Sequence, residues 1–182
     1  MNIDILNDVL DTLQLQGTVY FRTDFSPPWA VEVPRYSGAA RFHMLLQGSC
    51  HVQFASGENI QLQAGDLLLI PHGACHVIHD GDHPDAPPLQ SVLEDTGYDG
   101  EGVLVINGED TAASTQMVCG HFSFRPYADH PLLRLMPEHL LVKSSKRHQH
   151  VWLDEICRLI TRKVFSDDVA AQASVRRLTE VM

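Results

Sequence analysis

Three side chains of the sequence have the types that bind a transition metal: His43, His76 and Cys119. They lie far apart along the chain, and each stands in a short segment of strand-forming residues. Zn²⁺ accepts mixed imidazole and thiolate ligands, and three protein ligands leave a fourth position open for water or an effector. A cysteine favours Zn²⁺ over Fe(II), whose oxygenase sites use two histidines and a carboxylate. The sequence therefore predicts a zinc site, provided that three strands bring these residues together.

Each of the three residues also has a purely structural interpretation. A single histidine on a strand is commonly hydrogen-bonded in a core or exposed to solvent, and a buried cysteine behaves as a small hydrophobic residue. The remaining cysteines, Cys50, Cys75 and Cys157, are interpreted as structural in this way. Only the combination of two histidines and a cysteine on separate strands favours a metal.

Alternation of side chains along strands decides which neighbours share the site. If His43 faces inward, Arg41 and Leu45 lie on the same face. If Cys119 faces inward, so does His121.

Three other histidines are reserve or weaker candidates for the metal. His72 and His121 are reserve ligands. His79 is a weaker candidate, because alternation places it on the face opposite to His76.

The stretch from Gly65 to Asp80 organises the segments that would position these residues. Gly65-Asp66 is a turn, and the apolar run Leu67 to Ile70 predicts a short buried strand. Pro71-His72-Gly73 then forms a corner, because proline has no N–H to donate and glycine permits positive φ. A second strand follows from Cys75 to Ile78 and carries the candidate ligand His76.

Further short segments of strand type recur along the chain between turn residues. Their spacing predicts an antiparallel jelly-roll barrel, and the absence of a strand–helix–strand rhythm makes a parallel sheet unexpected. Residues 80–100 are rich in Asp, Gly and Pro, which predicts a long loop. The predicted strands are Thr18–Arg22, Ala30–Val33, Arg41–Leu46, His51–Phe54, Ile60–Leu62, Val103–Ile106 and Thr115–Phe124.

Helical periodicity marks the two ends of the chain. Asn2–Leu13 is predicted to be a short amphipathic helix, and after Pro137 the pattern again becomes helical. Ser166-Asp167-Asp168 fits the cap of a second C-terminal helix, which runs to Met182 without a terminating residue and suggests that a longer protein continues. We therefore predict a barrel over residues 1–142 and a helical linker or dimerisation segment over residues 143–182. The apolar stripe of its first helix is Val151, Trp152, Ile156, Leu159, Ile160 and Val164.

Charge and composition restrict the partners of this chain. The net charge of −10 argues against direct binding of a phosphate backbone. No Lys or Arg occurs between Arg41 and Arg125, which favours a cation or a neutral ligand over an anion there. No apolar run is long enough to span a membrane, and the start does not have the basic region of a secretory signal. Four widely spaced cysteines without a signal favour reduced thiols in the cytoplasm over two disulfides.

The stretch described above resembles the second conserved motif of the cupin superfamily, G(X)5PXG(X)2H(X)3N. Gly65, Pro71, Gly73 and His76 match that motif, and Asp80 stands where the family has Asn. The resemblance implies a mainly β fold, the cupin double-stranded β-helix or jelly-roll barrel, here with C-terminal α-helices.

A narrower resemblance is to the cupin-type N-terminal domain of AraC-family transcriptional regulators, and it covers roughly residues 5–180. It implies an effector-sensing domain that binds a small molecule or a metal in the barrel and forms a homodimer through its helices. In that family, DNA is bound by a further C-terminal domain, which is absent from this chain. The segments that carry this resemblance are Phe42-His43, Leu46-Gln47-Gly48, the Gly65–His76 motif, Cys119 to Phe124, and Pro131-Leu132-Leu133 with Pro137.

One departure from the cupin pattern bears on catalysis. Cupin metalloenzymes carry HxH followed by Glu in their first motif, whereas this chain has Arg41 at the place of the Glu. We therefore expect a non-enzymatic domain. The alternative is a small metal-dependent cupin enzyme, such as an oxygenase or isomerase, and a third option is a dimerisation module with an empty barrel.

Overall fold

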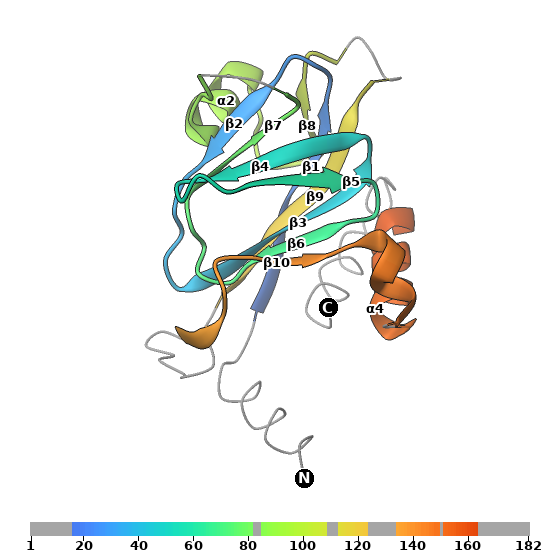
Figure 1. The fold of residues 1–182 in the computed structure, drawn as a ribbon. Coiled ribbons are helices and arrows are strands. Elements are labelled where there is room, and N and C mark those ends of the chain that lie inside the picture. The colour runs from blue at the N-terminus through green and yellow to red at the C-terminus, as the bar shows by residue number, and fades with distance from the viewer. Residues whose placement is uncertain (1–15, 82–84, 109–112, 124–133, 150, 164–182) are drawn as a thin grey trace.

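The computed structural model describes residues 16–81, 85–108, 113–123, 134–149 and 151–163. Ten strands form two sheets that face each other, with helices at the margins (Figure 1). This arrangement confirms the predicted mainly β barrel with C-terminal helical structure. The predicted helices at Asn2–Leu13 and from Val169 onward lie outside the described residues.

The larger sheet has the strand order β10-β6-β3-β9-β1-β8, and the smaller sheet has the order β2-β7-β4-β5. Every predicted strand is present in the described residues, and four of the nine are at least a residue longer than expected. The strands are β1 (Gln16–Phe25), β2 (Ala30–Val33), β3 (Ala39–Gln47), β4 (Ser49–Phe54), β5 (Asn59–Gln63), β6 (Leu67–Ile70), β7 (His76–His79), β8 (Val103–Ile106), β9 (Thr115–Ser123) and β10 (Leu140–Val142).

One strand pair departs from the expected antiparallel pattern. The strands β1 and β8 pair in parallel, with Arg22 opposite Val103 and Phe25 opposite Ile106. All other pairs of named strands in the described residues are antiparallel. The parallel pair lies at the margin of the larger sheet and leaves the central pairs β3–β6 and β3–β9 antiparallel as predicted.

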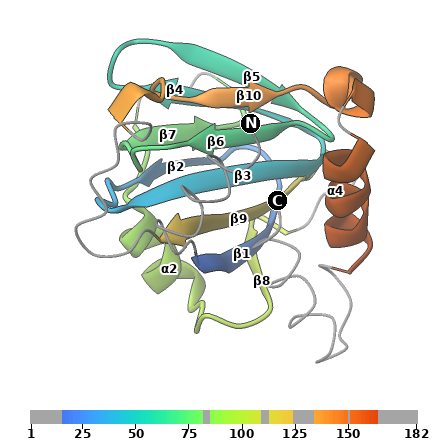
Figure 2. The ribbon, with the colours of Figure 1, turned by 90° about the horizontal axis from the view of Figure 1, so that it is seen from below.

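The larger sheet buries both of its faces, and side chains alternate between two hydrophobic clusters. Its inner face meets the smaller sheet in the main core, to which Leu45, Leu68 and Met117 contribute. Its outer face packs against the helix α4 (Val151–Lys163), which stands beside β6, β3 and β9 (Figure 2). Burial on both faces explains why the sequence of β6 is a continuous apolar run rather than an alternating one.

The helix α4 buries a different stripe from the one predicted. Leu153, Ile156, Cys157 and Ile160 are the buried residues, and they face Phe42, Met44, Leu67 and Val118 of the sheet. Val151 and Trp152, predicted to belong to the packed stripe, are exposed. The prediction omitted Leu153 and Cys157, because the apolar residues at the start of the helix cover more than one face.

The predicted loop over residues 80–100 is wrong in its second half, which forms the helix α2 (Leu89–Thr96). Val92 is buried, and Leu89 and Leu93 pack against the main core, so tertiary contacts stabilise this short helix. It ends at Gly97, which adopts the left-handed conformation common after helices. The Asp, Gly and Pro residues that suggested a loop are concentrated before Leu89.

The segment after Pro137 is not wholly helical either. The strand β10 first adds to the edge of β6, with Leu141 opposite Leu68, and a 3₁₀ helix, η1 (Ser144–Gln149), follows it. Three residues were too short a run to give a strand pattern in the sequence. The chain therefore attaches to the barrel by strand pairing before the helix α4 begins.

The motif glycine Gly73 allows two backbone segments to approach closely. It has a φ of 56°, and a Cβ atom there would lie 2.1 Å from the carbonyl oxygen of Tyr36. The Tyr36 N–H donates to the Gly73 carbonyl oxygen over 2.9 Å. This contact holds the segment before β3 against the corner after β6, so a larger residue at Gly73 would separate them.

Candidate functional site

The structure brings the three predicted metal ligands together between the two sheets. His43 on β3 lies directly opposite Cys119 on β9, and both point inward. His76 reaches them from β7 in the smaller sheet. All three side chains are buried. The site is thus formed at a point where the sheets face each other.

A continuous chain of hydrogen bonds links these side chains. The Nδ1 atom of His43 lies 3.1 Å from the Sγ atom of Cys119. The Nε2 atom of His43 lies 2.9 Å from the Nε2 atom of His76. The Nδ1 atom of His76 lies 2.8 Å from the carbonyl oxygen of Ala74.

The Ala74 carbonyl fixes the direction of every bond in this chain. A carbonyl oxygen only accepts, so Nδ1 of His76 carries the proton and donates, and Nε2 of a neutral His76 is left as an acceptor. His43 must then donate from its Nε2 atom, which leaves its Nδ1 atom to accept from the Cys119 thiol. The order is Cys119 to His43 to His76 to Ala74, and each group can be satisfied while neutral.

Burial favours the neutral form of every group in this chain. Desolvation lowers the pKa of His43 well below its usual value, and the charges of His76 and Arg41 act in the same direction. Desolvation likewise lowers the pKa of His76 to about 4. It raises the pKa of the Cys119 thiol. The cysteine is therefore a thiol at neutral pH, which makes it a poor nucleophile.

The observed geometry does not direct the three ligands at one point. A bound zinc ion needs a lone pair from each ligand aimed at the same place, but His43 points different ring nitrogens at His76 and Cys119. Among the described residues, no group of three His, Cys, Asp or Glu side chains is arranged to hold a metal. Zinc binding stays a prediction from residue types, and it would require the His43 ring to turn.

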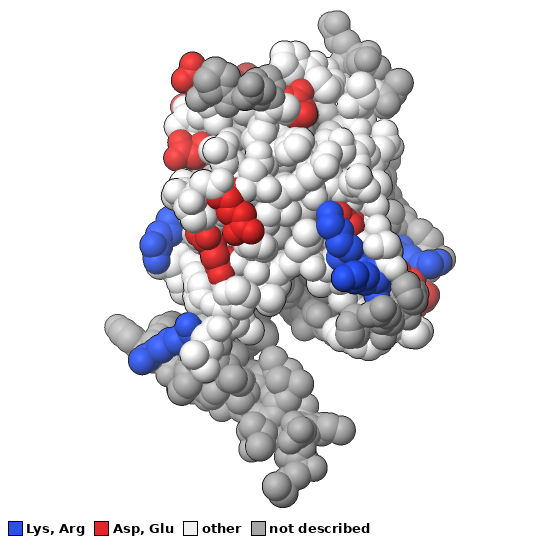
Figure 3. Space-filling model, in the orientation of Figure 1, with Lys and Arg blue, Asp and Glu red and all other residues white. Residues whose placement is uncertain are grey.

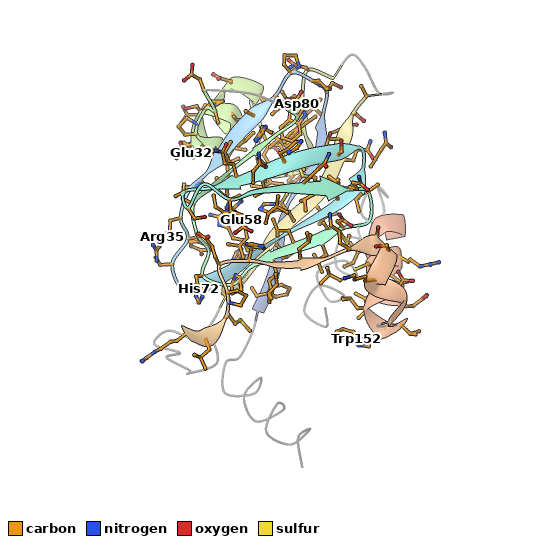
Figure 4. The ribbon with its side chains drawn as sticks, viewed as in Figure 1. Glu32, Arg35, Glu58, His72, Asp80 and Trp152 are labelled. Atoms are coloured by element: carbon orange, nitrogen blue, oxygen red, sulfur yellow. The ribbon has the colours of Figure 1, made fainter. Side chains whose placement is uncertain are left out.

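The reserve candidates lie outside this chain of hydrogen bonds. His72 is exposed near the outer margin of the barrel, with its Nε2 atom 2.9 Å from the Met136 carbonyl oxygen (Figure 4). His79 stacks on His51, at 5.4 Å between ring centroids, as expected for a residue facing away from His76. His121 is buried on β9, and its ring packs nearly perpendicular to the Tyr36 ring, with 5.0 Å between the ring centroids.

The zinc prediction gave no role in the site to Arg41, which the structure places beside its candidate ligands. It lies on the inner face of β3 beside His43 and is only 7% exposed. Its Cζ atom lies 5.6 Å from the centre of the Tyr36 ring, within range of a cation–π contact. Its charge contributes to the lowered pKa of His43, His76 and His121. The sequence signal was its place at the position where metal-binding cupins have Glu.

A cavity of about 30 Å³ lies beside Arg41 within the barrel. This volume has room for roughly two water molecules, because about 10–15 Å³ is needed for each. The lining is mostly apolar, and its polar side chains are those of Thr23, Arg41, His43 and Cys119. Its lining includes Arg41, His43, Cys119, Val31, Val33, Phe21 and Leu89.

A second buried charge, Asp66, ties the barrel to the segment that follows it. Its carboxylate accepts hydrogen bonds from the backbone N–H groups of Gln63 and Ser144 and from the Lys143 ammonium group. Burial alone would raise the pKa of Asp66, but these donors outweigh it and lower the pKa. The turn residue of the motif thereby anchors the start of η1.

The four cysteines form no disulfide, and all of them are free thiols. No helix in the described ranges is both long and apolar enough to cross a membrane.

Together, these features define a two-sheet barrel with a histidine–cysteine cluster and a buried arginine around a small cavity. The chain belongs to the cupin family: the family model described as cupin matches residues 4–182. No curated protein sequence matches the chain significantly.

Solved structures similar to this chain include two from bacteria. YhaK from Escherichia coli has 12% sequence identity and a TM-score of 0.42, and the match covers 73% of this chain and 45% of that one. An apo variant of ToxT from Vibrio cholerae has 8% identity and a TM-score of 0.42, with 92% of this chain and 53% of that one covered. The chain thus spans about half the length of each of these proteins.

Proposed function

We propose that this cupin domain is the effector-sensing and dimerisation domain of an AraC-type bacterial transcription regulator. The motif resemblance supports this proposal, because it extends beyond the cupin signature to segments in β3 and β9. The effector is a small molecule or a metal bound within the barrel. DNA is bound by a further domain rather than by this acidic chain.

The observation that carries the proposal is the double role of β3 and β9. On β3, Arg41 and His43 face the cavity, whereas Phe42 and Met44 face α4. On β9, Cys119 faces the cavity and Val118 faces α4. A ligand that shifts either strand from inside therefore acts on the surface that holds the helix, which is the coupling a sensor requires.

The chemistry of the site supports binding rather than catalysis. The histidines and the thiol are held neutral and are hydrogen-bonded to one another, so among the described residues neither a charged nucleophile nor a free general base faces the cavity. On the face drawn in Figure 3, the Lys and Arg side chains of the described residues lie in separate places rather than in one basic band. We propose a non-enzymatic domain that does not itself hold DNA.

The exposed apolar start of α4 supports dimerisation through the helical segment. Trp152 is 56% exposed and Val151 is 76% exposed, and Trp152 lies on the outside of the barrel (Figure 4). Large apolar side chains at this position are candidates for the centre of an interface. We expect Trp152→Glu to weaken self-association at least tenfold, because a typical central aromatic residue contributes about 2 kcal/mol or more.

The test measures both self-association and sensing. Sedimentation equilibrium of the wild type and Trp152→Glu gives the dimer constant, with Leu135→Glu as the control, because Leu135 is exposed outside α4. A fusion of the chain to a DNA-binding domain that must dimerise to repress a reporter tests the regulatory role. A wild-type chain that stays monomeric, or a fusion that never represses, would contradict the proposal.

A further inference from the structure

Arg41 is a buried cation without a hydrogen-bonding or oppositely charged partner among the described residues. Its side chain is 7% exposed, and its buried Nε atom makes no hydrogen bond within the described residues. No described Asp or Glu forms an ion pair with it. Its one specific contact is with the face of the Tyr36 ring.

This state is unusual because arginine cannot relieve the burial of its charge by losing a proton. A buried histidine or carboxyl can become neutral, as His43 and His76 do a short distance away. A guanidinium group stays charged, so an uncompensated one in a closed barrel attracts any anion that can reach it. The polar residues that line the cavity beside Arg41 carry no negative charge, because His43 and the Cys119 thiol are neutral and Thr23 has only a hydroxyl group.

We propose that Arg41 is the anchor of an anion site in the barrel, and that its ligand is the carboxylate of a small aliphatic acid. The guanidinium group presents two parallel N–H donors, which match the two oxygens of a carboxylate. The cavity beside it, at about 30 Å³, has room for a group of about that size. The single buried positive charge matches a monoanion.

The rest of the lining selects an apolar tail over a more polar anion. Val31, Val33 and Leu104 surround the cavity and offer no hydrogen bond from their side chains. A phosphate dianion would need more donors than this lining provides, whereas a hydrocarbon chain would need none. The lining continues to Phe21 and Leu89, which are half-buried, so the tail leads towards the surface at these residues.

An anion site at Arg41 is the opposite of what the distribution of Lys and Arg along the sequence predicts. The long interval without Lys or Arg begins immediately after Arg41, and the count therefore favoured a cation or a neutral ligand. The structure places the last arginine before that interval inside the barrel. One buried charge decides the local potential more strongly than many exposed carboxylates, which water screens.

The identification of the carboxylate as the effector rests on the proposed sensing function, but its binding does not. The experiment is thermal unfolding of the 182-residue chain in sodium butyrate or sodium chloride at equal ionic strength, with calorimetric titration of butyrate. At about ten times its Kd, butyrate should raise the Tm by roughly 3–6 °C relative to chloride. Arg41→Met should abolish this rise. Arg35→Met, which removes an exposed arginine, should retain it.

A second variant keeps the test decisive if Arg41→Met does not fold. Arg41→Lys retains the charge but not the paired donors, and it should weaken butyrate binding about tenfold. Equal responses of the wild type and an Arg41 variant, or no response to butyrate beyond that to chloride, would overturn the site. Stabilisation by phosphate but not by butyrate would overturn the carboxylate assignment. Butyrate binding through Arg41 without any reporter response would leave the site standing and refute the sensing function.

Discussion

Asp66 and Arg41 are two buried charges of one barrel with opposite surroundings. Asp66 is 1% exposed, and its carboxylate is surrounded by donors from the backbone of Gln63 and Ser144 and from Lys143. Arg41 is nearly as buried, and within the described part of the chain it has neither a hydrogen bond nor an ion pair. The first charge has been paired by the fold itself, and the second has not.

The difference separates a structural charge from a binding charge. A buried group whose hydrogen bonds are complete fixes the elements that supply them, here the turn before β6 and the start of η1. A buried group with none gains most when a ligand arrives, because the protein has already borne the cost of desolvating it. The comparison predicts that removing Asp66 weakens the fold, whereas removing Arg41 removes a ligand response.

The largest effect is expected at Asp66. Asp66→Ala leaves two backbone N–H groups and the Lys143 ammonium group without their acceptor, and it should reduce the free energy of unfolding by about 3–4 kcal/mol. Urea denaturation monitored by circular dichroism measures this loss. Asp95→Ala is the matched control, because Asp95 is exposed on α2 and its removal should change stability by less than about 0.5 kcal/mol. Equal effects of the two substitutions would refute the structural role of Asp66.

The next largest loss of stability is expected when the hydrogen bonds of the neutral side chains around His43 are removed. His43→Leu fills a similar volume but leaves Nε2 of His76 and the Cys119 thiol without a partner, so we expect a loss of about 2 kcal/mol. The same denaturation experiment, run with and without EDTA, also tests the predicted zinc ion. If only hydrogen bonds hold this cluster together, EDTA should leave the stability of the wild type unchanged. A wild type that EDTA destabilises to the level of His43→Leu would instead indicate a metal at this cluster.

The sequence was most informative where the periodic pattern of apolar side chains and the residue types indicated the same structure. Alternation predicted that Arg41 shares a face with His43, as it does, and the spacing from Gly65 to His76 located the corner that joins β6 to β7. Both are local properties of a strand or a turn, which a sequence displays directly. The fold class followed from the same signals.

Other features depend on contacts between distant segments and could not be seen in the sequence. The helix α2 forms because Val92 packs on the core, against the suggestion of the loop-like residues before it. Cys157 belongs to the buried face of α4 because that face meets β3 and β9. The lack of a partner for Arg41 among the described residues is likewise a property of the assembled barrel, because the sequence does not show which groups surround a buried side chain.

The smallest expected effect is the acid dependence of the Asp66 contribution. The pKa of Asp66 is lower in the folded chain than in the unfolded chain, so between the two values the unfolded state binds more protons and stability rises with pH. Its contribution is complete above the unfolded pKa of about 3.9 and is lost as pH falls through the folded value.

His43 and His76, whose pKa values are also lowered, reduce stability from about pH 6.5 downward, but they do so equally in the wild type and in Asp66→Ala. The difference in unfolding free energy between these two proteins should therefore stay constant from neutral pH to about pH 5 and shrink below about pH 4. It should shrink only in part, because a protonated carboxyl still accepts hydrogen bonds from Gln63 and Ser144. A difference that already falls between pH 7 and pH 5 would show that the histidines, and not the carboxylate, control the attachment of η1 to the barrel.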